Sequence, residues 1–276
     1  MSYQVVNLQP LLSGGHGDVF VGQRSDSGEH VVVKYLREYR CVHARKAFAR
    51  EIGVLARKLR GLVPLLGSDT QAEQPYYVMP YVKGGALTQY AGRLADEQLQ
   101  NIAAELARTL ANLHAVFEAH GDVKPDNILV THDGQLQVAD PLGNGSVFTM
   151  LFSENRGGTP GYCAPEIRAG GSISRAADIF SYGATMYHLR TGRRPQEGQR
   201  LFLSAEDYAR SPKICEIITA CCQLEPQSRP TTQEVLRMLR GARWADIQAE
   251  RKQRQELATA ACAIGVLVFL GVALSA

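Results

Sequence analysis

Hydrophobic residues in the first part of the chain come in short runs, separated by turns that are rich in glycine and polar residues. Runs of this length, with many β-branched and aromatic residues, are typical of strands. They predict strands at residues 5–12, 18–23, 30–36, 62–66 and 76–81. Between the third and fourth runs lies a basic segment in which apolar residues recur with helical spacing, at Ala47, Ile52, Leu55 and Leu59. This segment predicts one helix over residues 44–59.

After Gly84 and Gly85 the spacing of apolar residues changes to the 3.6-residue period of helices. Residues 96–119 repeat apolar side chains at Leu99, Ile102, Ala103, Leu106, Leu110 and Leu113. Further helices are predicted at residues 174–190, 212–222 and 232–240. A strand-rich first part and a helical second part indicate an α+β chain with two lobes. We expect the lobes to join near residues 82–85, with a ligand site between them.

The C-terminal residues 257–276 carry no charge. A helix of this length, at about 1.5 Å per residue, spans ~30 Å, which is the thickness of a bilayer core. The preceding segment, residues 243–256, is charged and contains the cationic Arg251, Lys252 and Arg254. The pattern predicts a charged juxtamembrane linker helix followed by a single-pass transmembrane tail anchor. The alternative is a buried C-terminal helix that docks on the domain.

The N-terminus indicates which side of the membrane the globular part occupies. Residues 1–10 lack a basic segment followed by an apolar run, so no signal peptide is predicted. We therefore expect the globular part to be cytoplasmic and held at a membrane. Ala261 and Gly265 have the small-residue spacing that lets two membrane helices approach, which is compatible with a homodimer through this helix.

Charge and cysteine content exclude some classes of protein. The chain has 30 lysines and arginines against 27 aspartates and glutamates, a net charge of +3, which is too small to argue for nucleic-acid binding. The six cysteines contain no C-x-x-C pair and no zinc-type spacing with histidine. We expect them to be reduced and mostly buried thiols.

The run HGDVKPDN, from His120 to Asn127, carries the clearest chemical signal. It places an aspartate, a lysine two residues later and an asparagine five residues later in one short loop. Phosphoryl transfer needs a carboxylate that accepts a hydroxyl proton, a cation beside the moving phosphate and oxygen ligands for Mg²⁺. An unrelated loop could carry this spacing by chance, so the rest of the chain must decide.

Further motifs occur in a consistent order along the chain. They are the glycine-rich turn LSGGHGDV at residues 12–19, the run VVVK that ends at Lys34, Glu51 within the basic helix, ADPLG around Asp140, and APE at residues 164–166. Taken singly, the turn is compatible with a plain hairpin and Glu51 with a surface charge. Together with HGDVKPDN, the set resembles the eukaryotic-like (Hanks-type) serine/threonine protein kinase family over roughly residues 8–240.

The resemblance implies the bilobal protein kinase fold, with a small β-rich N-lobe over residues 1–82 and a larger helical C-lobe over residues 83–242. Its activity would be transfer of the γ-phosphoryl group of ATP to serine or threonine hydroxyls of protein substrates. Asp122 would be the catalytic base, and Lys124 would neutralise charge on the phosphoryl group. Asn127 and Asp140 would bind Mg²⁺, or alternatively Mn²⁺.

The resemblance assigns most ATP contacts to the N-lobe. Lys34 would hold the α- and β-phosphates and pair with Glu51. Met79 would be the gatekeeper beside the adenine, and the backbone of Pro80 and Val82 would meet the adenine edge. The other residues assigned to ATP are Leu12, Gly14, Gly15, Gly17, Val19, Val32 and Leu129.

Structural roles are implied for residues further along the chain. Asp178 would anchor the catalytic loop, and Arg229 would pair with Glu166 of the APE motif. Thr159 and the APE segment would shape a platform for a peptide, which favours a protein acceptor over a small molecule.

Two positions depart from the family pattern. Gly121 stands where most kinases carry an arginine that pairs with an activation-loop phosphate, so we hypothesise that activity does not require this phosphorylation. Pro141 replaces the phenylalanine of the D-F-G motif. The five residues that the chemistry needs are nevertheless present: Lys34, Glu51, Asp122, Asn127 and Asp140. We expect a serine/threonine protein kinase at the cytosolic face of a membrane; the alternative is a membrane-tethered pseudokinase or scaffold that binds nucleotide without efficient catalysis.

Overall fold

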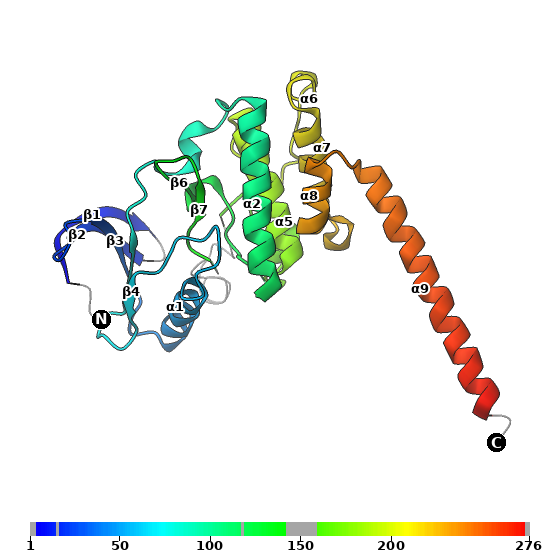
Figure 1. The fold of residues 1–276 in the computed structure, drawn as a ribbon, viewed down its shortest axis with the longest axis horizontal. Coiled ribbons are helices and arrows are strands. Elements are labelled where there is room, and N and C mark those ends of the chain that lie inside the picture. The colour runs from blue at the N-terminus through cyan, green and yellow to red at the C-terminus, as the bar shows by residue number, and fades with distance from the viewer. Residues whose placement is uncertain (1–3, 15–16, 117–118, 142–158, 274–276) are drawn as a thin grey trace.

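Five strands near the N-terminus pair into one antiparallel sheet, drawn in blue and cyan in Figure 1. The computed structural model describes residues 4–14, 17–116, 119–141 and 159–273, without the side chains of residues 12–14 and 261–273. The strands are β1 (Val5–Gly14), β2 (Gly17–Arg24), β3 (His30–Tyr35), β4 (Gly67–Asp69) and β5 (Tyr76–Pro80). Their order across the sheet is β1-β2-β3-β5-β4. The predicted strands at 5–12, 18–23, 30–36 and 76–81 are confirmed.

The prediction of a strand at residues 62–66 is wrong. The fourth strand is β4, and Leu62 forms only an isolated bridge with Val138. Pro64 lacks the N–H that a strand ladder needs. Leu62 packs in the core of the helical lobe, whereas Val63 packs in the core beneath the sheet. The apolar run therefore reflects burial between two cores rather than strand pairing.

Helix α1 (Val42–Leu55) packs against the five-stranded sheet. Its buried residues Phe48, Ile52 and Leu55 lie in one hydrophobic cluster with Tyr77 and Met79 of β5. The helix ends at Leu55, before the predicted boundary at residue 59. Lys58 has φ 52°, a left-handed conformation that a right-handed helix does not contain, and Leu59 packs against the core of the helical lobe.

The C-terminal lobe is built around α5 (Arg175–Thr191), most of whose residues are buried. Helices α2 (Asp96–Val116), α7 (Pro212–Cys221) and α8 (Thr232–Leu239) contribute to the same hydrophobic core. Ser174 caps the start of α5 with its side chain, and Gly192 ends it at φ 71°. The four helices predicted in this lobe are confirmed, and residues 117–118 at the predicted end of α2 lie outside the described residues.

Several short elements of three to six residues were not predicted, because they are too short to show a period. They are η1 (Leu87–Tyr90), η2 (Pro125–Asn127), β6 (Ile128–Val130), β7 (Leu136–Val138), α4 (Pro165–Arg168), α6 (Ala205–Arg210) and η4 (Pro226–Ser228). Strands β6 and β7 pair as a separate two-stranded sheet. This small sheet matters for the site, since it follows the HGDVKPDN loop and leads into Asp140.

The cysteines whose side chains are described carry free thiols, namely Cys41, Cys163, Cys215, Cys221 and Cys222. Burial raises the pKa of Cys221 well above its ordinary value, so this thiol stays protonated and unreactive. The thiols are free, as expected, but the expectation that most are buried is wrong for the described cysteines: Cys215 and Cys221 are buried, whereas Cys41, Cys163 and Cys222 are partly buried.

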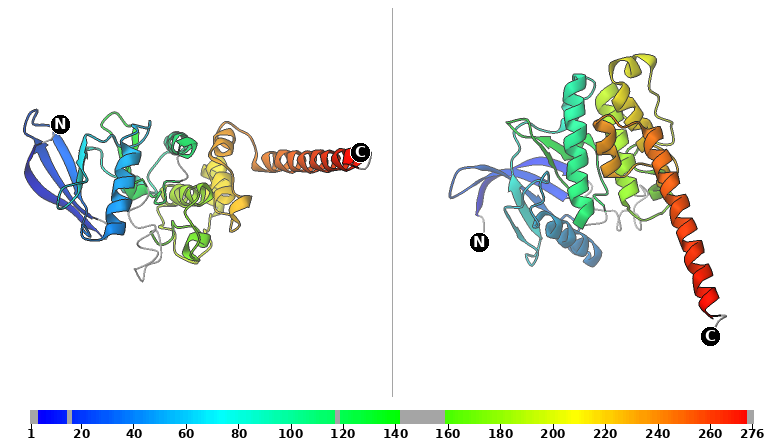
Figure 2. Two further views of the ribbon diagram at one scale, coloured as in Figure 1. Left: turned by 90° about the horizontal axis from the view of Figure 1, so that it is seen from below. Right: turned by 45° about the vertical axis from the view of Figure 1, so that its right-hand side comes forward.

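Helix α9 (Trp244–Ala273) projects away from the rest of the molecule in Figures 1 and 2. Among the residues of α9 whose side chains are described, only those at its beginning dock on the C-terminal lobe. Ile247 is 1% exposed and belongs to the helical core, and Arg251 forms an ion pair with Glu234 of α8. Residues 252–260 are exposed. The segment predicted as a linker at 243–256 is therefore partly held against the lobe.

The transmembrane tail expected at residues 257–276 finds no support here. Within the part of the chain that the structure describes, no helix combines the length and the apolar character needed to cross a membrane. The side chains of residues 261–276, including Ala261 of the expected homodimer contact, lie outside the described residues.

Candidate active site

Lys34, Glu51 and Asp140 meet where the five-stranded sheet, α1 and the segment after β7 come together. The ammonium of Lys34 donates to Glu51 Oε1 and to Asp140 Oδ1, each at 2.9 Å. Lys34 and Glu51 are 3% and 1% exposed, whereas the side chain of Asp140 is 35% exposed. The predicted Lys34–Glu51 pair is thus confirmed as a contact, and it lies against a partly accessible carboxylate.

The charges in this cluster shift one another's pKa. Burial alone would lower the pKa of Lys34, but the carboxylates of Asp140 and Glu51 outweigh burial and raise it. Burial would raise the pKa of Asp140, yet the charge and hydrogen bond of Lys34 hold it below its ordinary value. For Glu51 burial is the larger effect and raises the pKa, although Lys34 acts against it. Lys34 and Asp140 are therefore charged at neutral pH.

Tyr77 is a member of this cluster that the sequence reasoning missed. Its hydroxyl donates to Glu51 Oε1 at 2.8 Å and approaches Asp140 Oδ1 at 3.3 Å. The signal that could have found it is strand register, because Tyr77 of β5 is the cross-strand partner of Lys34 in β3. Residues that face each other across two strands share one side of the sheet.

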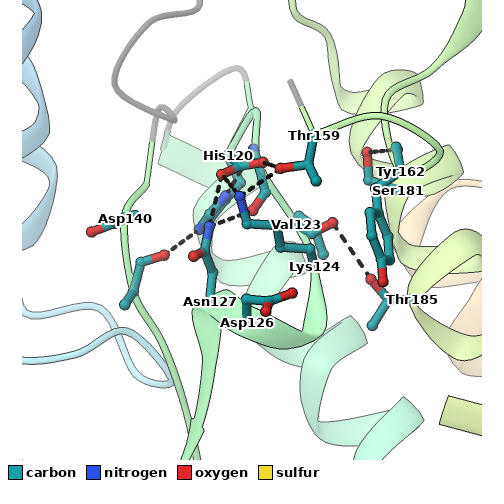
Figure 3. A network of polar contacts seen from close by, with 12 residues as sticks. His120, Val123, Lys124, Asp126, Asn127, Asp140, Thr159, Tyr162, Ser181 and Thr185 are labelled. Carbon is teal, nitrogen blue, oxygen red and sulfur yellow. Dashed lines mark hydrogen bonds and ion pairs between the residues drawn. The ribbon is translucent and has the colours of Figure 1, made fainter. Parts of the chain in front are cut away.

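The HGDVKPDN loop forms a second cluster around the carboxylate of Asp122. Oδ2 of Asp122 accepts from Lys124 Nζ at 2.6 Å and from Asn127 Nδ2 at 2.9 Å. Its Oδ1 accepts from the hydroxyl of Thr159 at 3.2 Å, and Lys124 also reaches this hydroxyl at 2.6 Å. Figure 3 shows Lys124, Asn127 and Thr159 within one network of polar contacts. The three loop residues predicted for the chemistry are thus brought together with Thr159, 37 residues away from Asp122.

Asp178, in the first turn of α5, holds the backbone of this loop. It accepts from the backbone N–H of His120 at 2.6 Å and of Gly121 at 2.8 Å, and His114 contacts it at 2.8 Å. The predicted anchoring role of Asp178 is confirmed. Gly121 has φ 86°, a left-handed conformation that glycine adopts without steric cost. The hypothesis about activation-loop phosphorylation concerns residues 142–158, which lie outside the described residues and leave it a prediction.

The two residues expected to bind a metal have the right chemistry for Mg²⁺. The Nδ2 group of Asn127 donates to the backbone oxygen and to Oδ2 of Asp122, both at 2.9 Å, so the amide oxygen is the atom left for a metal. Asp140 contributes a partly exposed carboxylate held ionised by Lys34. Its φ of 54° is unusual for a residue with a side chain, and such strain is common at functional positions. The residues present therefore fit the metal that the family uses.

The glycine-rich turn joins β1 and β2 next to Lys34. Gly14 and Gly17 pair across the turn, while Gly15 and the side chain of Leu12 lie outside what the structure describes. A Cβ atom at Gly17 would lie 2.7 Å from the carbonyl oxygen of Tyr35 and 3.5 Å from the side chain of Lys34. Only glycine allows this close approach, which brings the backbone of Gly17, at the start of β2, against Lys34.

The apolar residues assigned to the adenine gather in one cluster. Val19, Val32, Met79 and Leu129 all lie in or against the core cluster beneath the sheet. Val32 and Met79 face each other across β3 and β5. Pro80 ends β5, and the carbonyl oxygen of Val82 accepts from the N–H of Gly85 at 3.3 Å in the connection to the C-terminal lobe. An apolar lining with backbone polar groups at its edge suits a planar base.

Glu166, the last residue of the APE segment, and Arg229 form the predicted pair. Arg229 binds both carboxylate oxygens of Glu166, at 2.6 and 2.8 Å. It also donates to the backbone oxygens of Gln223, Ala176 and Leu224. The guanidinium has five N–H donors, and these contacts use all of them. The pair is therefore a rigid brace for this part of the lobe.

Comparison with known proteins agrees with this geometry. A model of the protein kinase domain matches residues 6–239. The chain is 34% identical over 248 residues to a probable serine/threonine-protein kinase, PkwA, of Thermomonospora curvata, covering 83% of this chain and 33% of the relative. It is 30% identical over 208 residues to the DNA damage-responsive serine/threonine-protein kinase RqkA of Deinococcus radiodurans, covering 71% and 30%. To the serine/threonine-protein kinase PknA of a Nostoc species it is 31% identical over 254 residues, covering 82% and 44%.

The chain thus spans less than half the length of each of these relatives. The kinase match nevertheless covers most of the chain, including the strands around Lys34, the HGDVKPDN loop and the Glu166–Arg229 pair. This chain belongs to the protein kinase family.

Proposed function

We propose that this chain is an ATP-dependent protein-serine/threonine kinase. The observation that carries the proposal is the convergence of Lys124, Asn127 and Thr159 on the carboxylate of Asp122. A second charged cluster, Lys34 with Glu51 and Asp140, supports it by offering a cation for phosphates. Phosphoryl transfer needs both sets of groups.

In this proposal Asp122 positions the acceptor hydroxyl and takes its proton. Lys124 lies 2.6 Å from the Asp122 carboxylate, close enough to balance negative charge on the transferred group. Lys34 turns from Asp140 toward the α- and β-phosphates and keeps Glu51 as its partner. Asn127 and Asp140 would hold Mg²⁺, which would neutralise charge on the phosphate oxygens.

A protein hydroxyl is the proposed acceptor. Thr159 links Asp122 to the segment that leads into Glu166, and Arg229 braces that segment through its bidentate bond. A platform fixed in this way next to the catalytic aspartate suits an extended peptide better than a small molecule. The names of the relatives, serine/threonine-protein kinases, support the same acceptor class.

The test is phosphoryl transfer from γ-labelled ATP and Mg²⁺ to casein, with the full chain and its Asp122→Asn variant. Loss of the base should reduce transfer by about 10²- to 10⁴-fold. Asp133→Asn is the matched control, because Asp133 lies in the exposed turn between β6 and β7 and bonds only within that turn among the described residues. Equal labelling by all three proteins would refute the enzyme proposal. Nucleotide binding without transfer would favour the pseudokinase alternative.

A membrane location is a separate proposal that rests on the uncharged sequence of residues 257–276 alone. No described helix supports it. Cell fractionation of the full chain and of a chain that ends at residue 256 tests the membrane location. Equal recovery of both chains in the soluble fraction would refute a membrane anchor at residues 257–276.

A further inference from the structure

Tyr77 is buried at the centre of the Lys34 cluster, where it connects the sheet to α1. It is 0% exposed and lies opposite Lys34 in the β3–β5 pairing, with the Lys34 ammonium 5.6 Å from the centre of its ring. Its ring packs on that of Phe48, with centroids 5.4 Å apart, and its hydroxyl reaches Glu51 less than one turn later in α1. A buried hydroxyl needs a partner, so this bond defines the position of both side chains.

The hydroxyl of Tyr77 binds the same carboxylate oxygens as Lys34. Its distances are 2.8 Å to Glu51 Oε1 and 3.3 Å to Asp140 Oδ1, and those of Lys34 are 2.9 Å to each. A phenol has one hydrogen to donate, and the shorter contact assigns it to Glu51. The second oxygen of Glu51, Oε2, is buried and has no hydrogen-bond partner among the described residues. Oε1 therefore carries both of the bonds that orient Glu51.

In the proposed function, the contacts of Lys34, Asp140 and Tyr77 respond differently to nucleotide binding. Lys34 and Asp140 each have a second task in the proposed function, at the phosphates and at the metal. Tyr77 has no such task, so its bond to Glu51 remains unchanged when the other two partners shift. In the proposed function Lys34 keeps Glu51 but gives up Asp140, so Glu51 Oε1 retains two donors, and of these only Tyr77 has no contact with nucleotide.

We propose that Tyr77 is a positioning residue: its hydroxyl holds Glu51, and through Glu51 the ammonium of Lys34, in the arrangement that binds nucleotide. The inference rests on the proposed function, because it assigns Lys34 to the phosphates. Phenylalanine at this position would keep the packing on Phe48 but leave the buried Glu51 carboxylate with one donor fewer. Hydrogen bonds to charged groups are stronger than neutral ones, so we expect ADP to bind about tenfold more weakly.

The experiment measures the dissociation constant of ADP by calorimetry for the full chain and the variants Tyr77→Phe, Tyr76→Phe, Glu51→Gln and the double variant Tyr77→Phe/Glu51→Gln. Tyr76→Phe is the matched control, since Tyr76 precedes Tyr77 on β5, faces the other side of the sheet and packs on Tyr35 with ring centroids 5.5 Å apart. Phe48→Leu tests packing alone, because it alters the ring contact and keeps the hydroxyl.

We expect about tenfold weaker ADP binding for Tyr77→Phe, both with Mg²⁺ and with EDTA, and affinities within about twofold of the unaltered chain for Tyr76→Phe and Phe48→Leu. In the Glu51→Gln background the further effect of Tyr77→Phe should fall to less than about twofold, because residues that act through one contact are not additive.

Three results would overturn the inference. They are an unchanged affinity for Tyr77→Phe, a full tenfold effect retained in the Glu51→Gln background, and an effect that disappears in EDTA, which would assign Tyr77 to Asp140 and the metal. If the unaltered chain binds no ADP, this inference and the proposed function both fail. If it binds ADP but transfers no phosphate, only the proposed activity fails.

Discussion

Two ion pairs that join a buried cation to a glutamate, Arg229–Glu166 and Lys34–Glu51, are built in opposite ways. Arg229 has every N–H donor satisfied, by both oxygens of Glu166 and by three backbone carbonyls, and it stacks on Phe180 at 5.2 Å. Lys34 has two described carboxylate partners, one of them partly exposed, and one oxygen of Glu51 has no hydrogen-bond partner among the described residues.

The difference indicates that one ion pair stabilises the fold and the other takes part in the proposed chemistry. A guanidinium whose planar fork is fully bonded has no alternative arrangement of equal energy, so the Arg229–Glu166 pair stabilises its lobe. An ammonium shared between two carboxylates can exchange one of them for a phosphate at small cost. Disrupting the Arg229–Glu166 pair should therefore lower the free energy of unfolding, whereas disrupting the Lys34–Glu51 pair should lower the rate of phosphoryl transfer.

Replacing Arg229 with methionine should cause the largest effect on stability. The change leaves the Glu166 carboxylate and three carbonyl oxygens without their donor. Breaking a buried pair in this way costs about 3–5 kcal/mol, and we expect about 3 kcal/mol because Glu166 is 25% exposed and water can reach it. Urea unfolding followed by circular dichroism measures the loss. ADP affinity should remain within about twofold, since the nucleotide cluster is untouched.

Arg237→Met is the matched control for Arg229→Met. Arg237 binds Glu250 through two hydrogen bonds, but the side chains of Arg237 and Glu250 are 40% and 41% exposed. Exposed pairs contribute about 0–1 kcal/mol and less at high salt. A cost for Arg237→Met as large as that for Arg229→Met would contradict the distinction between a buried brace and a surface pair.

Replacing Lys34 with methionine should mainly reduce catalysis. Loss of a positioned cation that stabilises developing charge lowers turnover by about 10²- to 10³-fold. The fold should tolerate the change better than that at Arg229, because Glu51, whose pKa burial already raises, can take up a proton and keep its bond from Tyr77. Transfer assays and urea unfolding of the same samples provide the comparison. A greater loss of stability in Lys34→Met than in Arg229→Met would contradict the assignment of Arg229 to stability and of Lys34 to catalysis.

Acid should loosen the docking of α9 through the Glu234–Arg251 ion pair. Burial opposes the shift, but hydrogen bonds from Arg251 and Thr231 outweigh it and lower the pKa of Glu234 from 4.5. A depressed pKa means that this carboxylate stabilises the folded state above pH 4.5 and loses its contribution as the pH falls through the lower value. Trp244, the one tryptophan of the chain, stacks on Arg251 at 5.0 Å and reports the change by fluorescence.

For this pH effect, Glu234→Gln is the decisive comparison. The amide cannot form the ion pair with Arg251 at any pH, so its emission should already differ near neutral pH. Emission identical to that of the unaltered chain would show that the Glu234–Arg251 pair does not hold α9.

The sequence predicted the fold and the candidate site correctly where a helix was long or where a motif placed several functional groups close together. Helices such as α2 and α5 repeat apolar residues over several turns, and the HGDVKPDN run contains its own functional groups within eight residues. The strand expected at residues 62–66 failed because burial between two cores and strand pairing produce the same short apolar run. The docking of Ile247 and Arg251 was missed because the charged residues around them indicate a solvated helix.

The protein kinase family, the proposed base Asp122 and the pairing of Lys34 with Glu51 follow from the order of motifs along the chain. Tyr77 and the use of Thr159 as a partner of Asp122 do not, because neither lies in a motif with the residues it contacts. Hydrogen bonds between side chains 26 and 37 residues apart depend on strand register and on how the lobes pack. Local sequence determines which groups are available, whereas packing over long distances decides which of them share an oxygen atom.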